Sequence, residues 1–437
     1  MEILLTLLYA CFFIILILRI KFFRIEGFSI KVIAGVFVLK ILAGITMYFI
    51  YTRYYPDRST ADIFKYFDDS RVMYEALWSR PLDFFKMIFS ISNDTAYFDQ
   101  QYYHHMNNWF RVYESNIYND SHTIIRINAV IRIFSFGYFN VHTVFMCFIS
   151  LTGMVALYRF FMAYLPYKKK LLFFAVFLIP SVVFWGSGVL KEAVLLFGIG
   201  VMLFSVSELL NRRRCIINII MLLISLVLLL YIKYYIFIII IPLTLGYVWC
   251  RLTSNRQVYL KYGLILALCI ITGLNIQHVF PEFNALNIIA MKQNDFVGLA
   301  KAVNSGSLIS EELLEPTLSD FIVHTPVAFF NTLVRPYIFE SGSVVILFAA
   351  LENIFILLLA LVCIVFASKK IQDRSVFLFC MLFFTSLYVL TGLTTPVFGA
   401  MVRYKVPAMP FLLIFLFMLL DTEKLIRRFP VMKKLTG

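Results

Sequence analysis

Long apolar runs dominate the chain, separated by short polar loops and by two long polar segments. The runs lack the two-residue alternation of a half-buried strand, and most are long enough to cross a bilayer as a helix. Runs of this kind exclude a membrane barrel. We expect about 11 transmembrane helices, over about residues 2–19, 32–51, 141–164, 171–187, 192–210, 215–250 (two helices turning at Lys233), 258–275, 343–367, 375–391 and 405–421.

The predicted fold class is all-α: a polytopic integral membrane protein with one transmembrane domain over residues 1–437. The two long segments, 52–140 and 276–341, are expected outside the membrane and to contain short interfacial helices. The stretch from His122 to Gly137 is too polar and too short to span, so we expect a helix lying along the membrane. Composition agrees, since 61% of residues are hydrophobic and 15% charged, against about 45–50% and about 25% in soluble domains.

Lysine and arginine gather in every second short loop and in the C-terminal tail. By the positive-inside rule these loops are cytoplasmic, which places the N-terminus and both long segments outside and the C-terminus in the cytoplasm. The same rule accounts for most of the net charge of +14, so we expect no nucleic-acid partner. The protein is expected to contact membrane lipid instead.

Charged residues on the expected outer side are the candidate site residues, because they break the positive-inside pattern. Lys191 and Glu192 are adjacent at the junction of two apolar runs. Grouped cations suit a phosphate or pyrophosphate, and a nearby carboxylate suits activation of a hydroxyl. We expect Asp62 and Glu192 to be catalytic and the following residues to bind substrate at the same outward-facing pocket: Lys191, Arg335, Glu340, Arg403, Lys405, Tyr66 and Trp185.

Most of these residues also have a plainer interpretation. Lys191 and Glu192 would form an interfacial ion pair at a helix start. Arg335, Arg403 and Lys405 would anchor loops at the headgroups, and Asp62 would be a solvated carboxylate. Trp185 and the tyrosines would form an aromatic belt at the membrane surface.

Glu352 and four histidines are further polar residues of the chain. Glu352 falls near the middle of an expected span, so it must face protein or water, and a polar bond between helices would explain it. The histidines His104, His105, His122 and His142 lack the spacing of a metal site, and we expect them on the surface. The sequence predicts no defined metal site or cofactor and leaves a divalent cation open.

The residues resemble two groups of membrane proteins. An acidic residue after an early helix (Asp62) and a second one opening a later helix (Glu192) resemble the pattern of polytopic GT-C-type glycosyltransferases. The strings Pro180-Ser…Phe184-Trp185…Lys191-Glu192, Arg335-Pro336…Glu340 and Arg403-Tyr-Lys-Val-Pro407 resemble bacterial surface-polysaccharide membrane proteins, including Wzy-type (O-antigen) polymerases. Asp62 is not part of an Asp-Glu or Asp-X-Asp pair, which is a departure from the metal-binding pattern.

The resemblance implies an enzyme of the bacterial inner (plasma) membrane with a polyprenyl-linked sugar or oligosaccharide as its partner. Three functions stay open. The first is a glycosyltransferase that uses a polyprenyl-phosphate or pyrophosphate donor outside the cytoplasm. The second is a polymerase of polysaccharide repeat units. The third is a transporter or flippase of a lipid-linked saccharide, which would favour internal repeats and broken helices at the midplane.

Overall fold

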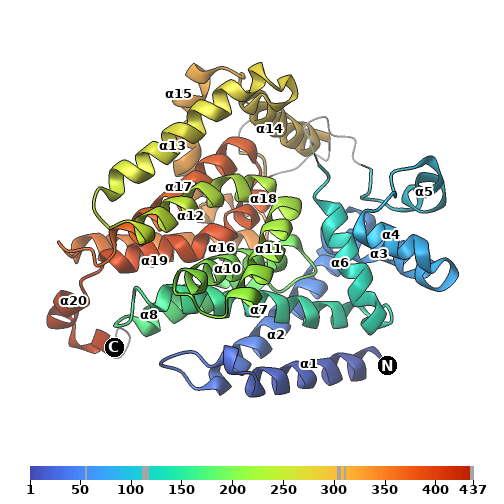
Figure 1. The fold of residues 1–437 in the computed structure, drawn as a ribbon, viewed down its shortest axis with the longest axis horizontal. Helices are drawn as coiled ribbons and strands as arrows, with labels where there is room; N and C mark the ends of the chain where they lie inside the picture. Colours follow the sequence, from blue (N-terminus) through green and yellow to red (C-terminus); the bar gives the residue numbers. More distant parts are fainter. Residues whose placement is uncertain (55–56, 111–117, 303–306, 310–311, 434–437) are drawn as a thin grey trace. The chain divides into compact units, whose positions relative to one another are not determined.

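A computed structural model describes residues 1–54, 57–110, 118–302, 307–309 and 312–433 (Figure 1). These residues form helices and connecting turns, without a β-sheet in any of the described ranges. Ten helical stretches of the described chain are long and apolar enough to cross a membrane. The expected all-α, polytopic fold class is therefore confirmed.

The spans begin and end within a few residues of the predicted positions in most cases. They are α1 (Glu2–Arg19), α2 (Ile30–Tyr54), α7 (Phe139–Met162), α10 (Lys191–Leu210), α11 (Cys215–Ile232), α12 (Tyr234–Leu252), α13 (Val258–Asn275), α16 (Val344–Val365), α17 (Arg374–Thr394) and a last span built from α18 (Phe398–Tyr404), a 3-10 turn and α19 (Met409–Leu419).

The span expected over about 171–187 is not one continuous helix. It consists of α8 (Lys169–Phe173), a π-helical stretch (Phe174–Leu178) and α9 (Pro180–Trp185). The helix stops at Ile179, whose backbone is extended. Proline disfavours a helical conformation in the residue before it and has no N–H to donate, so Pro180 ends one helix and opens the next.

The chain divides into two compact units. Unit 1 comprises Met1–Arg159, Val183–Ser205 and Cys215–Tyr234, and unit 2 comprises Phe160–Val182, Val206–Arg214 and Tyr235–Gly437.

Close helix packing at glycines holds unit 1 together. A side chain at Gly200 of α10 would lie 1.9 Å from the carbonyl oxygen of Gly153 in α7, so the two backbones touch directly. Small residues at such crossings are typical of membrane helices, where close van der Waals packing drives association. Aromatic rings fill the space between α1, α2 and α7, with Phe13 stacked on Phe148 at 4.4 Å and edge-on to Phe37.

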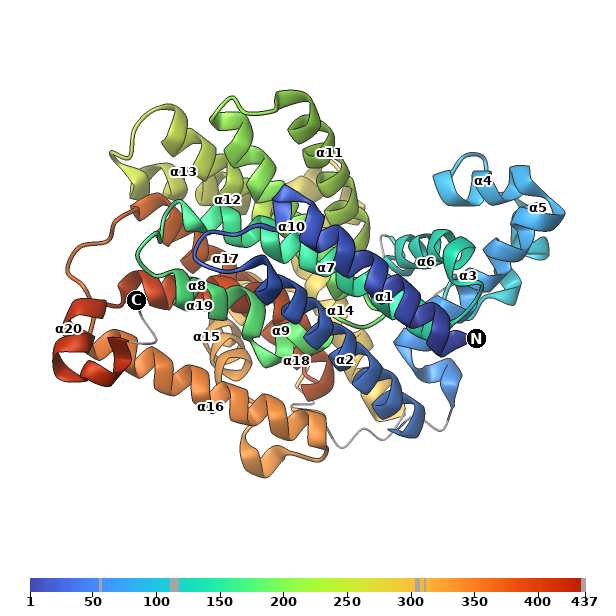
Figure 2. The same ribbon diagram turned by 90° about the horizontal axis from the view of Figure 1, so that it is seen from below.

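The first long segment folds as a helical group at the edge of unit 1. It contains α3 (Asp62–Ser79), α4 (Pro81–Phe89), α5 (Ala96–Gln101) and α6 (Ser121–Ser135), which lie together in both ribbon views (Figures 1 and 2). The expected helix over His122 to Gly137 is α6. Its apolar side, with Ile124, Ile125 and Ala129 fully buried, packs against α3.

One histidine prediction is wrong. His142 is fully buried in α7, where its ring nitrogens bond to Ser135 and Asn128. His104 and His105 are exposed, as expected, and His122 is half-buried.

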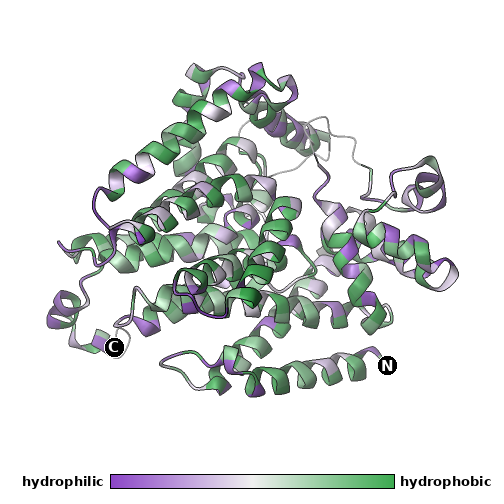
Figure 3. Ribbon diagram, viewed as in Figure 1, coloured by the Kyte–Doolittle hydropathy of each residue, from purple (hydrophilic) through white to green (hydrophobic). Residues whose placement is uncertain are grey.

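Unit 2 is built around α17. The helix α15 (Leu318–Val334) packs along it so closely that a side chain at Gly392 would lie 2.1 Å from the carbonyl oxygen of Ala328. The helices α14 (Ala285–Ala302) and α19 also pack against α17. Figure 3 shows mostly hydrophobic residues along α13 of this unit and α1 of unit 1, as expected for helices whose outer faces meet lipid.

Candidate functional site

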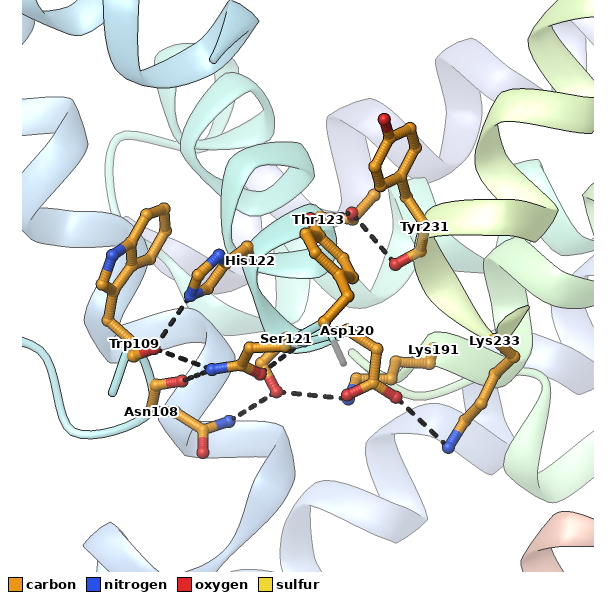
Figure 4. A network of polar contacts seen from close by, with 11 residues as sticks. Asn108, Trp109, Asp120, Ser121, His122, Thr123, Lys191, Tyr231 and Lys233 are labelled. Atoms are coloured by element: carbon orange, nitrogen blue, oxygen red, sulfur yellow. Dashed lines mark hydrogen bonds and ion pairs between the residues drawn. The ribbon is translucent and has the colours of Figure 1, made fainter. Parts of the chain in front are cut away.

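The strongest concentration of buried charge in unit 1 is centred on Asp120. Its carboxylate lies 2.8 Å from the ammonium of Lys191 and 3.4 Å from the ammonium of Lys233 (Figure 4). Both lysine side chains are more than nine-tenths buried. Two cations therefore share this carboxylate at a place with little access to water.

These three residues come from three helix ends. Lys191 is the first residue of α10, Lys233 is the single residue between α11 and α12, and Asp120 directly precedes α6. The contacts place the start of α10, the end of α11 and the first long segment on one side of the membrane. The prediction from loop charge had put them on the same side as well; which side that is stays a prediction.

Polar and aromatic groups extend the cluster. The Lys191 ammonium also donates to the Ser121 hydroxyl at 3.2 Å and lies 5.1 Å from the centre of the Tyr66 ring. Asn108 donates to the same hydroxyl at 3.0 Å. The sequence-predicted pair of Lys191 and Tyr66 is thus brought together, with Tyr66 buried in α3.

An aromatic stack stands beside this cluster. Trp109 lies between Tyr103, at a ring distance of 4.1 Å, and His122, at 3.7 Å. The His122 ring also bonds to the backbone oxygen of Trp109 (Figure 4). The stack joins Trp109 to His122 in the first turn of α6, which begins directly after Asp120.

Asp69 of α3 fixes the chain before Trp109. Its carboxylate accepts the backbone N–H groups of Asn107 and Asn108, each at 2.8 Å. Burial raises the pKa of Asp69 to about 6, and the two hydrogen bonds offset this only in part. Since Asn108 bonds to Ser121, the conformation held by Asp69 extends to the hydroxyl that contacts Lys191.

The other predicted residues of unit 1 take different positions. Glu192 is almost fully buried in the first turn of α10, directly after Lys191. Asp62 is half-buried in the first turn of α3, one helical turn from Tyr66. Trp185 ends α9 and is buried within the protein, which does not fit a side chain of a lipid-facing aromatic belt.

Unit 2 contains the remaining predicted residues. Arg335 makes a forked ion pair with Glu340, whose second oxygen accepts the N–H of Tyr337 at 2.8 Å. Burial opposes ionisation of Glu340, but the hydrogen bonds from Arg335 and Tyr337 outweigh it and hold its pKa below the ordinary value. The Arg335 guanidinium also lies 5.4 Å from the centre of the Phe398 ring.

A second buried cluster in unit 2 surrounds Lys405. Its ammonium donates to the Asn353 side chain at 2.7 Å and to the backbone oxygen of Thr332 at 3.2 Å. The neighbouring Glu352 is buried and accepts the N–H of Ser181 at 2.7 Å. Glu352 therefore faces protein, as expected, through this hydrogen bond. The buried Lys405 does not fit the interpretation as a headgroup anchor.

The predicted site residues therefore fall into two sets, one in each unit. Arg403, in α18, is buried like Lys405. The residues that the sequence reasoning missed are Asp120, Ser121 and Lys233. Lys233 carried the same signal as Lys191, a cation between two apolar runs on the expected outer side, whereas nothing in the sequence distinguished Asp120.

A metal site of three or more His, Cys, Asp or Glu side chains does not occur among the described residues. Comparisons with protein-family models, curated proteins and solved structures found no match. The fold and the two clusters define a class: an all-α, multi-pass membrane protein with two clusters of buried charged side chains, one at the ends of spans and one within them. The resemblance to GT-C-type and Wzy-type enzymes stays a prediction.

Proposed function

We propose that the protein is a membrane glycosyltransferase that moves a sugar or glycan from a polyprenyl-phosphate or pyrophosphate donor to an acceptor hydroxyl outside the cytoplasm. The observation that supports this most is the burial of Lys191 and Lys233 together at the ends of two spans. Lipid phosphates lie at the level where membrane spans end, and two ammonium groups in a poorly hydrated place would attract one.

In the proposed reaction the acceptor oxygen forms a bond to the anomeric carbon of the sugar. The bond from that carbon to the phosphate oxygen breaks, and its electron pair stays with the polyprenyl phosphate. Lys191 and Lys233 compensate the charge of this leaving group, which fixed cations do well in a dry site. The acceptor proton passes to a carboxylate, for which Glu192 and Asp62 are the candidates.

Asp120 has a different part in this proposal. A carboxylate that pairs with two cations is a weak base, because their charges favour its ionised form. Asp120 instead keeps both ammonium groups oriented. The incoming phosphate would share the lysines with it.

The arrangement of unit 2 supports a second contact region for the substrate. Arg335 and Lys405 are cations next to the carboxylates Glu340 and Glu352. In a repeat-unit polymerase, donor and acceptor are both lipid-linked, so this alternative would need two regions of this kind. A flippase would also bind a lipid phosphate, but it would transfer no sugar.

The first experiment tests binding of the leaving group, which all candidate donors share. Protein in detergent is titrated with undecaprenyl phosphate, and with undecaprenol as the uncharged control. Hydrogen bonds to charged groups contribute about 1.5–3 kcal/mol, so Lys191→Met/Lys233→Met should weaken binding at least tenfold, by about 1.4 kcal/mol or more. Lys31→Met, at an exposed lysine that begins α2, is the matched control.

The second experiment separates transfer from transport. Protein in detergent is given undecaprenyl phosphate or pyrophosphate carrying a radiolabelled sugar, together with a saccharide acceptor. A transferase releases the lipid phosphate and forms a labelled glycan without a bilayer, whereas a flippase leaves the donor intact. Equal affinity for undecaprenyl phosphate and undecaprenol in the first experiment would refute the proposed site in either case.

A further inference from the structure

The short helix α4 exposes large apolar side chains although it lies outside the spans. Leu82, Phe85 and Phe89 are 76%, 50% and 66% exposed. Their spacing of three and four residues puts them on one face of the helix. With nine residues, α4 is far too short to cross a bilayer.

The opposite face of α4 is packed into unit 1. Phe84 and Met87 are buried, and the Arg126 side chain of α6 donates to the backbone oxygen of Met87 at 2.8 Å. The helix is therefore apolar on two sides. One side belongs to the protein core, and the outward side needs an occupant, because a contiguous exposed apolar surface usually marks an interaction site.

The position of α6 shows what lies next to α4. At one end of α6, Asp120 contacts Lys233 at the end of α11. At its other end, the backbone oxygen of Phe134 accepts the Tyr9 hydroxyl of α1 at 2.9 Å. Tyr9 lies about halfway along α1, so α6, about 22 Å long at 1.5 Å per residue, extends from the end of one span to the middle of another. Arg126, in the first half of α6, holds α4 beside these spans.

The surroundings of the exposed face fit lipid chemistry. Trp78, three residues before the start of α4, and Ile91, two residues after its end, are exposed as well. Arg80 and Lys86 are exposed beside this face. Cations and a tryptophan around an apolar helix face are typical of helices that lie at the level of the headgroups.

We propose that α4 inserts its outer face, Leu82, Phe85 and Phe89, into the bilayer leaflet on the side of Lys191. Arg80 and Lys86 then contact lipid phosphates. The first long segment is attached to the membrane at a point away from the spans, and the aromatic stack and Asp120 are held next to the lipid surface. This proposal does not depend on the proposed reaction.

Spin labels on α4 test the proposal in single-copy nanodiscs that contain anionic lipid. The exposed native cysteines Cys11, Cys215 and Cys269 are first replaced by serine. Labels then go on Leu82→Cys, Phe85→Cys and Phe89→Cys. The exposed polar positions Glu75→Cys and Asp94→Cys are the water controls, and Ile15→Cys on the exposed side of α1 is the lipid control.

Collision rates with oxygen, which concentrates in lipid, are compared with those of a water-soluble nickel chelate. We expect collisions with oxygen to be the more frequent at the three α4 positions, as at Ile15. Collisions with the nickel chelate should be the more frequent at Glu75 and Asp94. Nickel dominance on α4 would place the face in water and overturn the proposal. Low rates with both would mean that protein covers the face, which also overturns it.

A second measurement needs no label. Brominated lipids quench tryptophan fluorescence at short range, so wild-type protein should lose more emission in them than Trp78→Phe does. Equal quenching in the two proteins would contradict insertion of this surface.

Discussion

The Lys40 ammonium donates to the backbone oxygen of Gly186 at 3.0 Å, from within the membrane-spanning helix α2. Lys40 is fully buried, and Gly186 lies in the connection from α9 to α10 that leads to Lys191. The connection also fits tightly against α2, where a side chain at Gly44 would lie 2.6 Å from the Ser187 oxygen. An ionisable residue at such a depth is costly, and here it fixes the chain that presents Lys191.

Replacement of Lys40 by methionine should destabilise the protein. The variant keeps most of the side-chain volume but leaves the buried Gly186 oxygen without this donor, which costs about 1–3 kcal/mol. We expect a lower thermal midpoint in detergent and weaker binding of undecaprenyl phosphate. Lys31→Met, at the exposed start of the same helix, should change neither, and a Lys40→Met protein with an unchanged midpoint would show that the bond is unimportant.

Removal of the Asp120 carboxylate should be more damaging than removal of either lysine. In Asp120→Asn two buried ammonium groups lose the carboxylate that they share, and breaking a buried ion pair costs about 3–5 kcal/mol. The double variant Asp120→Asn/Lys191→Met should be less unstable than the sum of the two single changes, because it removes both members of one ion pair together. Thermal or denaturant unfolding in detergent measures this coupling.

An exposed ion pair provides the control for Asp120. Arg58 and Asp68 pair at 2.7 Å, with more than a third of each side chain exposed. Surface pairs contribute about 0–1 kcal/mol, so Asp68→Asn should change stability little. If Asp120→Asn lowers the free energy of unfolding no more than Asp68→Asn does, the cluster around Lys191 does not stabilise the fold.

The sequence predicted the spans well because the length of an apolar run is limited by the bilayer. The break at Pro180 was visible in the sequence, but the run around it is apolar on both sides and looked continuous. The pairing of Asp120 with two lysines could not be predicted, because it depends on which helix ends meet. The outward face of α4 was missed for a related reason: its apolar pattern fits a buried helix equally well until the other face is seen to pack.

Asp69 should make stability depend on pH. Its pKa rises from 3.8 in the unfolded chain to about 6 in the folded protein, chiefly because of burial. Between these values the folded protein binds more protons than the unfolded chain, so stability decreases as pH rises from about 4 to about 6, by up to about 1.4 kcal/mol per pH unit. Above that window the contribution is constant.

The variant Asp69→Asn removes this titration and should flatten the stability profile between about pH 4 and 6. Above pH 6 the thermal midpoint of Asp69→Asn will also differ from that of the wild type, because the substitution alters the hydrogen bonds to Asn107 and Asn108. The neighbouring Asp68→Asn should keep most of the wild-type slope, because burial, and not the charge of Asp68, is the largest cause of the raised pKa of Asp69. An identical slope in wild type and Asp69→Asn would assign the pH dependence to another group.

Activity is expected to depend on Glu192 and Arg335, one residue from each unit. Glu192→Gln keeps the shape of the side chain but cannot accept a proton, and loss of a general base lowers a rate by about 10²–10⁴-fold. Arg335→Ala removes the cation beside Glu340, so Glu340→Gln is its companion variant. Glycan formation should be abolished by Glu192→Gln and by Arg335→Ala while the protein still inserts normally, as judged by membrane fractionation and by its thermal midpoint.

The matched control for Glu192→Gln is Glu208→Gln, near the opposite end of the same helix α10, which should retain wild-type product. A pH profile separates a base from a structural residue. If Glu192 accepts the proton, the residual rate of Glu192→Gln loses the acidic limb of the wild-type profile, because no carboxylate remains to be protonated. Normal glycan formation by both Glu192→Gln and Arg335→Ala would remove the enzyme interpretation, and the buried charges near the ends of the spans would then have to be explained by folding or by transport.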